Sequence, residues 1–146
     1  MMADIKLKIR HAKRGNEKTL NLSGLGISEL PADITQLTLL EVLNVSNNKL
    51  KDLKRVESLP NLRVIDASNN SITSLHQELL DMFSLDSLFL FGNPIVNSNS
   101  QLAKIENNSV QIRKALESYF GMSGGSSGAL GGIGSQSTSI GGGIAS

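Results

Sequence analysis

The sequence predicts an α/β repeat fold, in which short parallel strands lie side by side and a helical segment closes each end of the stack. Three observations predict it: a motif that recurs every 22–23 residues, a two-residue apolar alternation inside each motif, and amphipathic segments on either side of the repeated region. The chain has 146 residues, which is the size of one domain. Since only 3% of the residues are aromatic, aliphatic side chains must form the core.

The motif consists of apolar residues at fixed intervals followed by an asparagine. Its three regular copies are Leu40-x-x-Leu43-x-Val45-x-x-Asn48-x-Leu50, Leu62-x-x-Ile65-x-Ala67-x-x-Asn70-x-Ile72 and Leu85-x-x-Leu88-x-Leu90-x-x-Asn93-x-Ile95. A degenerate copy precedes them, with Glu17 at the first position and Leu25 at the asparagine position. The copies begin at residues 17, 40, 62 and 85. Their alternation is typical of short strands, whose inward side chains are buried only by the next copy.

These motifs resemble those of the leucine-rich-repeat family over residues 17–95. The resemblance implies a leucine-rich-repeat solenoid with a curved parallel β-sheet on its concave face and helical caps at both ends. It also implies that the asparagine at the ninth repeat position is buried and bonds backbone groups of the turning loops, where an unpaired group costs about 1–3 kcal/mol. We therefore interpret Asn48, Asn70 and Asn93 as a structural ladder and not as catalytic residues.

The N-terminal segment, residues 1–16, is predicted to be a basic capping helix ahead of four repeats in residues 17–98. Ile5, Ile9 and Ala12 fall at helical spacing, while Ile5, Leu7 and Ile9 also alternate as in a strand. The family resemblance favours the helix, since similar segments before a first repeat are helical caps. The basic side chains at its other positions are interpreted as a solvated face, and a site for an acidic partner is the alternative.

Residues 99–120 are predicted to form a C-terminal helical cap that seals the last repeat. The amphipathic positions are Ile112, Ala115, Leu116, Tyr119 and Phe120. Asn108 and Gln111 have the spacing of a capping box. Leu102 and Ile105 suggest a shorter helical turn before it.

Residues 121–146 are predicted to be a disordered tail, because they contain ten Gly, seven Ser and no charged side chain. Such a composition cannot bury enough apolar surface to offset the entropy of ordering the backbone. The alternative is that the isolated Leu and Ile side chains of the tail dock into a partner or into the protein's own groove.

Composition argues against several classes of function. The chain has no cysteine, which rules out disulfides, thiolate catalysis and the common zinc fingers. A net charge of +1 gives no global attraction to nucleic acid or to anionic membranes. No apolar run is long enough for a secretory signal or a membrane span, which predicts a cytoplasmic protein.

The two histidines offer no catalytic or metal site. His11 and His76 lie in different predicted elements, and His76 is expected to be exposed to solvent. We therefore predict a protein with no enzymatic activity, no metal, no cofactor and no small-molecule substrate.

The surface predicted to bind a partner is the exposed face of the strands. Because strand side chains alternate, the residues between the buried positions share this face. The predicted partner-binding residues are Val42, Asn44, Val64, Asp66, Ser87, Phe89 and Phe91. These positions become more apolar toward the last repeat, where two Phe side chains lie close together. The alternative is that the C-terminal cap covers both.

Such a surface predicts a non-enzymatic adaptor or scaffold that binds another protein. A regulatory subunit of a phosphatase or a small GTPase is the alternative, because the family resemblance implies such roles as well. Binding of nucleic acid through the basic N-terminal helix is disfavoured, since recognition of RNA bases by stacking needs exposed aromatic side chains among the basic ones.

Overall fold

The computed structural model describes residues 2–121 of the chain. The described residues divide into two compact units between Ile112 and Arg113. The predicted disordered tail, residues 121–146, lies outside the described residues apart from Gly121.

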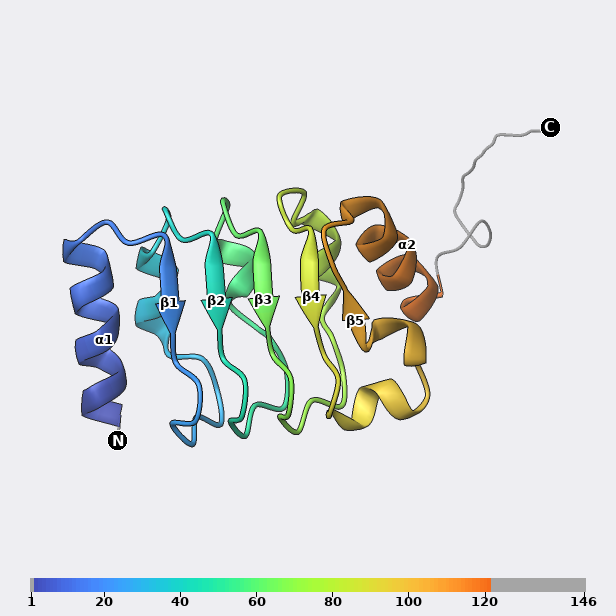
Figure 1. Cartoon of the computed structure of the whole chain (residues 1–146), viewed down its shortest axis with the longest axis horizontal. Coiled ribbons are helices and arrows are strands. Elements are labelled where there is room, and N and C mark those ends of the chain that lie inside the picture. The colour runs from blue at the N-terminus through green and yellow to red at the C-terminus, as the bar shows by residue number, and fades with distance from the viewer. Residues whose placement is uncertain (1, 122–146) are drawn as a thin grey trace. The chain divides into compact units, whose positions relative to one another are not determined.

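Five short strands form a single sheet in the order β1-β2-β3-β4-β5 (Figure 1). The strands are β1 (Thr19–Asn21), β2 (Val42–Asn44), β3 (Val64–Asp66), β4 (Ser87–Phe89) and β5 (Lys104–Ile105). The first four are parallel, and the register pairs Leu20, Leu43, Ile65 and Leu88 across the sheet. Each of these four strands therefore begins at the same position of its repeat, which confirms the predicted stack of parallel strands.

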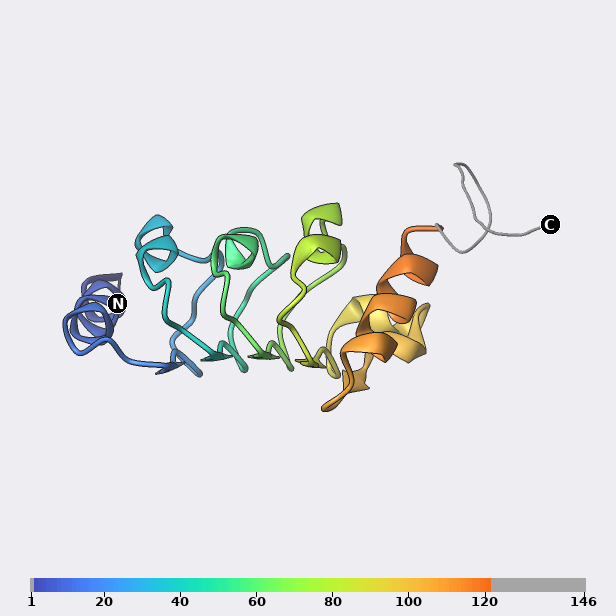
Figure 2. The same ribbon diagram turned by 90° about the horizontal axis from the view of Figure 1, so that it is seen from above.

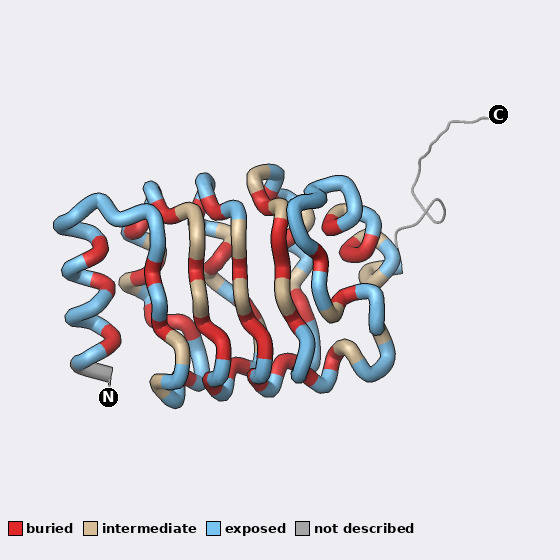
Figure 3. The backbone as a smooth tube through the Cα atoms, in the orientation of Figure 1, coloured by how far each residue is buried: buried red, intermediate tan, exposed pale blue. Residues whose placement is uncertain are grey.

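Each repeat returns to the next strand through a 3-10 helix that lies on the side opposite the sheet (Figure 2). These helices are η1 (Ala32–Gln36), η2 (Val56–Ser58) and η3 (Gln77–Asp81). Each buries one aliphatic side chain, namely Ile34, Val56 or Leu79. The core lies between these helices and the sheet, and Figure 3 shows the buried positions recurring along the strands. It is aliphatic, as the composition predicts.

The first repeat follows a helix, α1 (Met2–Arg14), which lies beside β1 and η1. Ile5, Ile9 and Ala12 are buried, so helical spacing and not strand alternation describes this segment. The helix ends in a Schellman motif, in which the Glu17 N–H donates to the Ala12 carbonyl and Asn16 adopts φ +50°. Asparagine tolerates this left-handed conformation better than most side chains do.

The same left-handed conformation recurs at the eighth position of every repeat, where the chain turns after its strand. These positions are Gly24, Asn47, Asn69 and Gly92, with φ of 68°, 57°, 56° and 79°. Only Gly and Asn occupy the column, because other side chains are strained at positive φ. Gly92 has a second reason to be Gly, since a Cβ there would collide with the side-chain oxygen of Asn69.

The predicted all-helical C-terminal cap is wrong in one part, because residues 104–105 form the strand β5, antiparallel to β4. Leu102 ends the 3-10 helix η5 (Ser100–Leu102), which follows η4 (Pro94–Asn97), but Ile105 is in the strand. The Leu90 N–H donates to the Ala103 carbonyl at 2.8 Å, as the equivalent N–H of each earlier repeat donates to the next strand. A non-repeating segment thus pairs the edge that the last repeat leaves open.

The helix α2 (Ser109–Tyr119) buries Ile112, Ala115 and Leu116 on one side. Asn108 caps it, accepting a hydrogen bond from the Gln111 N–H at 3.0 Å. The capping box is only half formed, because the Asn108 N–H donates to the Asp86 carbonyl at 2.9 Å. The reciprocal bond to Gln111 is therefore replaced by one to the last repeat.

Candidate functional site

The asparagine ladder holds the turns that present the strands. Asn70 is 8% exposed, and its side-chain oxygen accepts a hydrogen bond from the Leu50 N–H at 3.0 Å. Its side-chain nitrogen donates to the carbonyls of Val45 and Ala67, at 3.1 and 3.0 Å. One amide thus joins its own repeat to the preceding one. Equivalent bonds are made by Asn48 and Asn93.

This direction of bonding explains why the first repeat has no asparagine. The N–H groups of Leu25 and Ile27 both donate to the side-chain oxygen of Asn48, at 3.0 Å each. The turn of the first repeat is therefore served by the second. An asparagine at position 25 would have no preceding repeat to bond, so an apolar residue can stand there.

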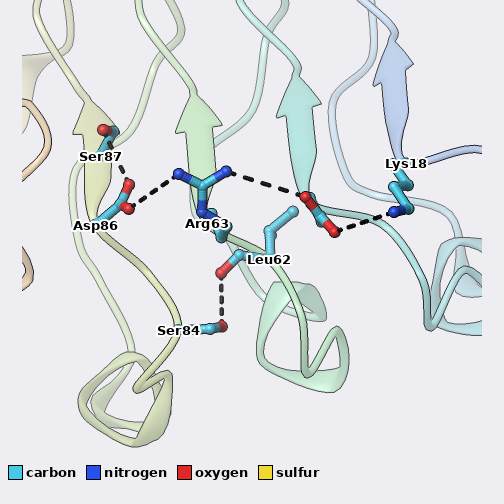
Figure 4. A network of polar contacts seen from close by, with 7 residues as sticks. Lys18, Leu62, Arg63, Ser84, Asp86 and Ser87 are labelled. Carbon is cyan, nitrogen blue, oxygen red and sulfur yellow. Dashed lines mark hydrogen bonds and ion pairs between the residues drawn. The ribbon is translucent and has the colours of Figure 1, made fainter.

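A row of alternating charges crosses the repeats at the residue just before each strand (Figure 4). The Lys18 ammonium lies 3.9 Å from Glu41, and the Arg63 guanidinium lies 4.0 Å from Glu41 and 3.4 Å from Asp86. These side chains are 25–69% exposed, so each pair contributes about 1 kcal/mol or less. The sequence interpretation missed this row, although alignment of the second repeat positions shows the alternation.

Three repeats carry a polar pair on the exposed face of the sheet. The side-chain oxygen of Asn44 accepts from the Ser46 N–H at 3.0 Å and from the Ser46 hydroxyl at 2.7 Å. Asp66 accepts from Ser68 in the same way, at 3.1 and 2.7 Å. The first repeat has the backbone bond alone, between Asn21 and Ser23. The predicted contact residues Asn44 and Asp66 are thus held in fixed positions, with one oxygen engaged locally.

The fourth repeat replaces this polar pair with two Phe side chains. Phe89 stands at the position of Asn44 and Asp66 and is half-buried, whereas Phe91 stands at the serine position and is 44% exposed. Asp66 pairs with Phe89 on one side in the sheet register, and Lys104 pairs with it on the other. Facing positions of neighbouring strands share one side of a sheet, so an acid and a base flank the aromatic side chain.

Val42 and Val64 extend this face toward the first repeat. They face each other across β2 and β3, and both are half-buried. In the second and third repeats this face therefore carries a polar pair and a valine, and in the fourth repeat it carries Phe89 and Phe91.

The prediction that Ser87 lies on the exposed face is wrong. Ser87 is 3% exposed, because the backbone after β5 passes over it and the Asn107 N–H donates to its hydroxyl oxygen at 2.9 Å. The hydroxyl also lies 3.2 Å from an oxygen of Asp86 (Figure 4). We therefore exclude Ser87 from the candidate surface, which consists of Val42, Asn44, Val64, Asp66, Phe89 and Phe91 and is called the aromatic face below.

The expectation that His76 is solvent-exposed is also wrong. Its side chain is 11% exposed, and its Nε2 atom lies 2.6 Å from a carboxylate oxygen of Glu57. The same oxygen accepts a hydrogen bond from the Arg55 N–H at 2.9 Å. Burial raises the pKa of Glu57, but the hydrogen bond to His76 and the backbone donors lower it by more, so its pKa falls below the usual value.

This His76–Glu57 pair joins the second and third 3-10 helices on the side opposite the aromatic face. Within residues 2–121, no group of three or more His, Asp or Glu could hold a metal ion. Over the same range, no helix is long and apolar enough to cross a membrane.

Comparisons with known proteins agree with this arrangement. Residues 38–81 match the family described as "Leucine Rich repeats (2 copies)". The solved structure of the Leptospira interrogans LRR protein LIC12759 is similar, with a TM-score of 0.58 and 34% sequence identity. The similarity covers 74% of this chain and 26% of that protein.

Two curated proteins are similar in sequence. F09G8.5 of Caenorhabditis elegans is 33% identical over 88 residues, and the Leucine-rich repeat and WD repeat-containing protein 1 of Danio rerio is 30% identical over 81 residues. These segments are 59% and 56% of this chain but only 19% and 10% of those proteins. The chain therefore spans a small part of the length of the curated relatives that it matches.

Domains with such repeats generally bind proteins and are typically non-catalytic. The repeat spacing, the stacked parallel strands, the family match and the similar solved structure together show that this chain is a leucine-rich-repeat protein.

Proposed function

We propose that this chain is a non-enzymatic adaptor or scaffold that binds another protein through the aromatic face. One observation carries the proposal: the fourth repeat has Phe89 and Phe91 at positions where the other repeats have a locally bonded polar pair. Phe91 is 44% exposed, and none of the buried hydrophobic residues of the described chain is aromatic. Large apolar side chains on a surface are typical of interaction sites.

The flanking charges suit this patch to a partner with mixed chemistry. Asp66 and Lys104 face Phe89 from either side, so the centre is apolar and its border carries both signs of charge. Interfaces combine an apolar centre with a polar rim in this way. We therefore expect a partner that inserts an apolar side chain beside Phe89 and pairs with one or both of the charges.

The rigid framework under the patch supports binding without rearrangement. The strands are held by the asparagine ladder, and Asp66 is fixed by two bonds from Ser68. A side chain that is already ordered loses less conformational entropy when a partner binds. Two aromatic anchors on such a sheet can supply most of the binding free energy, since removal of a strong anchor costs about 2 kcal/mol or more.

The test combines affinity capture with a stability measurement. A Phe89→Ala/Phe91→Ala variant and the intact chain are compared for quantitative recovery of bound proteins and for the midpoint of urea unfolding. The matched control is Leu7→Ala/Phe83→Ala, which removes two side chains that are 47% and 75% exposed elsewhere on the molecule.

We expect the first variant to lose a partner that the control retains, with an unfolding midpoint close to that of the intact chain. If instead its stability falls by about 3–5 kcal/mol, as for Phe removed from a core, the two Phe residues are structural and the proposal fails. Equal recovery by both variants would also reject it.

A further inference from the structure

The helix α1 carries a charge that the rest of the chain does not share. It has five basic side chains and one acidic one, a formal charge of +4, while the remaining residues have nine basic and twelve acidic side chains, a formal charge of −3. The net charge of +1 therefore conceals a strong asymmetry. A local concentration of one sign attracts ligands of the opposite sign even when the total charge is small.

These basic side chains border a groove between α1 and η1, which lie next to each other in Figure 2. The groove has a volume of about 420 Å³, and the residues lining it include Lys6, Arg10, Lys13 and Arg14. Asp33 and Gln36 of η1 form its other wall. Ile9, which is only 2% exposed, also lines the groove.

The groove continues into a smaller hollow of about 60 Å³ that shares Lys13 and Gln36 with it. Leu39, which is 48% exposed, lies at this second hollow. A ligand in the groove could therefore extend along α1 from its basic row to an apolar side chain.

The charges in the groove are not neutralised by the fold. Among the described residues, no carboxylate lies within ion-pair distance of Lys6, Arg10, Lys13 or Arg14. By contrast, Lys18 and Arg63 in the repeats each have an acidic partner. The four groove cations are thus available to a ligand.

Their spacing fits an extended chain. Lys6, Arg10 and Arg14 are four residues apart on α1, which places them about 6 Å apart along the helix axis. Alternate side chains of an extended peptide point to one side and are about 6.6 Å apart. Carboxylates at alternate positions of a peptide could therefore each meet one cation of the helix.

We propose that the groove between α1 and η1 binds an extended acidic peptide segment of a partner protein. The partner's alternate carboxylates pair with Lys6, Arg10 and Arg14, and the side-chain amide of Gln36 bonds the peptide backbone. This is a second site, separate from the aromatic face, because its lining belongs to the first helix and the first 3-10 helix.

The lining favours a peptide over other anionic ligands. It contains no aromatic side chain on which a nucleic-acid base could stack. Residues 122–146 of the chain carry no charged side chain, so they offer none of the carboxylates that the groove requires.

The test uses the whole chain and a fluorescein-labelled peptide of alternating Glu and Ser residues, with binding followed by fluorescence anisotropy. Arg10→Gln/Arg14→Gln removes two groove charges that pair with the peptide, and the control Lys8→Gln/Lys51→Gln removes two exposed charges outside the groove. We expect the groove variant to bind about tenfold more weakly, from the loss of two charge pairs. The control variant has the same net charge as the groove variant, but it should bind the peptide as tightly as the intact chain does.

A second groove variant, Lys6→Gln/Arg14→Gln, should weaken binding to a similar extent, which keeps the test valid if the first variant unfolds. Equal weakening by the groove and control variants would show only diffuse attraction and overturn the proposal. The proposal would also be overturned if a peptide of alternating Gln and Ser bound as tightly as the Glu-Ser peptide. If a single-stranded DNA of matched charge bound more tightly than the Glu-Ser peptide, the groove would be assigned to nucleic acid. If the intact chain self-associated and the groove variants did not, the groove would be assigned to a second copy of the chain.

Discussion

Replacing Asn70 with Ala removes a buried amide that holds two repeats together. Asn70 accepts a hydrogen bond from the Leu50 N–H at 3.0 Å and donates to the Val45 and Ala67 carbonyls. Alanine can form none of these bonds, and the substitution leaves a buried N–H without its acceptor. One such group costs about 1–3 kcal/mol, so we expect the free energy of unfolding to fall by that amount.

The assay is urea unfolding followed by circular dichroism, with Asn97→Ala as the control. Asn97 is exposed at the end of η4, and a surface substitution of this kind changes stability by about 0.5 kcal/mol or less. Equal losses in the two variants would refute the structural role of the ladder.

An Asn70→Asp variant separates the acceptor from the donor. Aspartate keeps the oxygen that accepts from Leu50 but places a carboxylate beside the carbonyl oxygens of Val45 and Ala67. Burial raises the pKa of such a carboxyl. The substitution therefore destabilises the fold least at low pH, where the carboxyl is protonated, and more as the pH rises through the folded-state pKa. The variant should be nearest to the intact chain in acid. If the difference in unfolding free energy between the variant and the intact chain did not change with pH, this explanation would be contradicted.

Three further substitutions test other parts of the structure. Gly92→Ala should lower the free energy of unfolding by more than about 1 kcal/mol, because Gly92 has φ +79° and a Cβ would collide with Asn69; unchanged urea stability would contradict this. Arg63→Gln should cost about 1 kcal/mol or less, with an effect that disappears in high salt, and a larger loss would show that the charge row is a main support. Because the pKa of Glu57 is lowered in the folded state, its ionised carboxylate stabilises the fold above the unfolded-state pKa, and this stabilisation is lost as the pH falls through the folded-state pKa. Glu57→Gln should therefore reduce the loss of stability with falling pH below about pH 4.5. An unchanged acid dependence would show that the bond to His76 does not form in solution.

The repeated part of the fold could be predicted from the sequence because its geometry is carried by local spacing. Leu43, Ile65 and Leu88 occupy one repeat position and lie opposite each other in the sheet. Alternation then determines which side chains share a face, so the half-buried Val64 and the exposed Phe91 follow from the register. The charge row could have been predicted in the same way, since it occupies a single repeat position.

The features that the sequence did not predict depend on residues that are distant in the chain and outside the repeat. Ile105 belongs to a strand because the open edge of β4 needs partners, and no periodicity marks this need. Ser87 is buried by the Asn107 backbone, twenty residues further along. His76 is 11% exposed and its ring lies 2.6 Å from Glu57, nineteen residues before it. Side-chain pairing between such positions follows from the fold and not from a motif.

The most direct test of binding through the aromatic face is hydrogen exchange of the intact chain with and without its captured partner. We predict added protection in β3, β4 and the turn at Phe91, and no added protection in η2 and η3 on the opposite side. Protection confined to the 3-10 helices, with unchanged exchange around Phe91, would contradict the central claim.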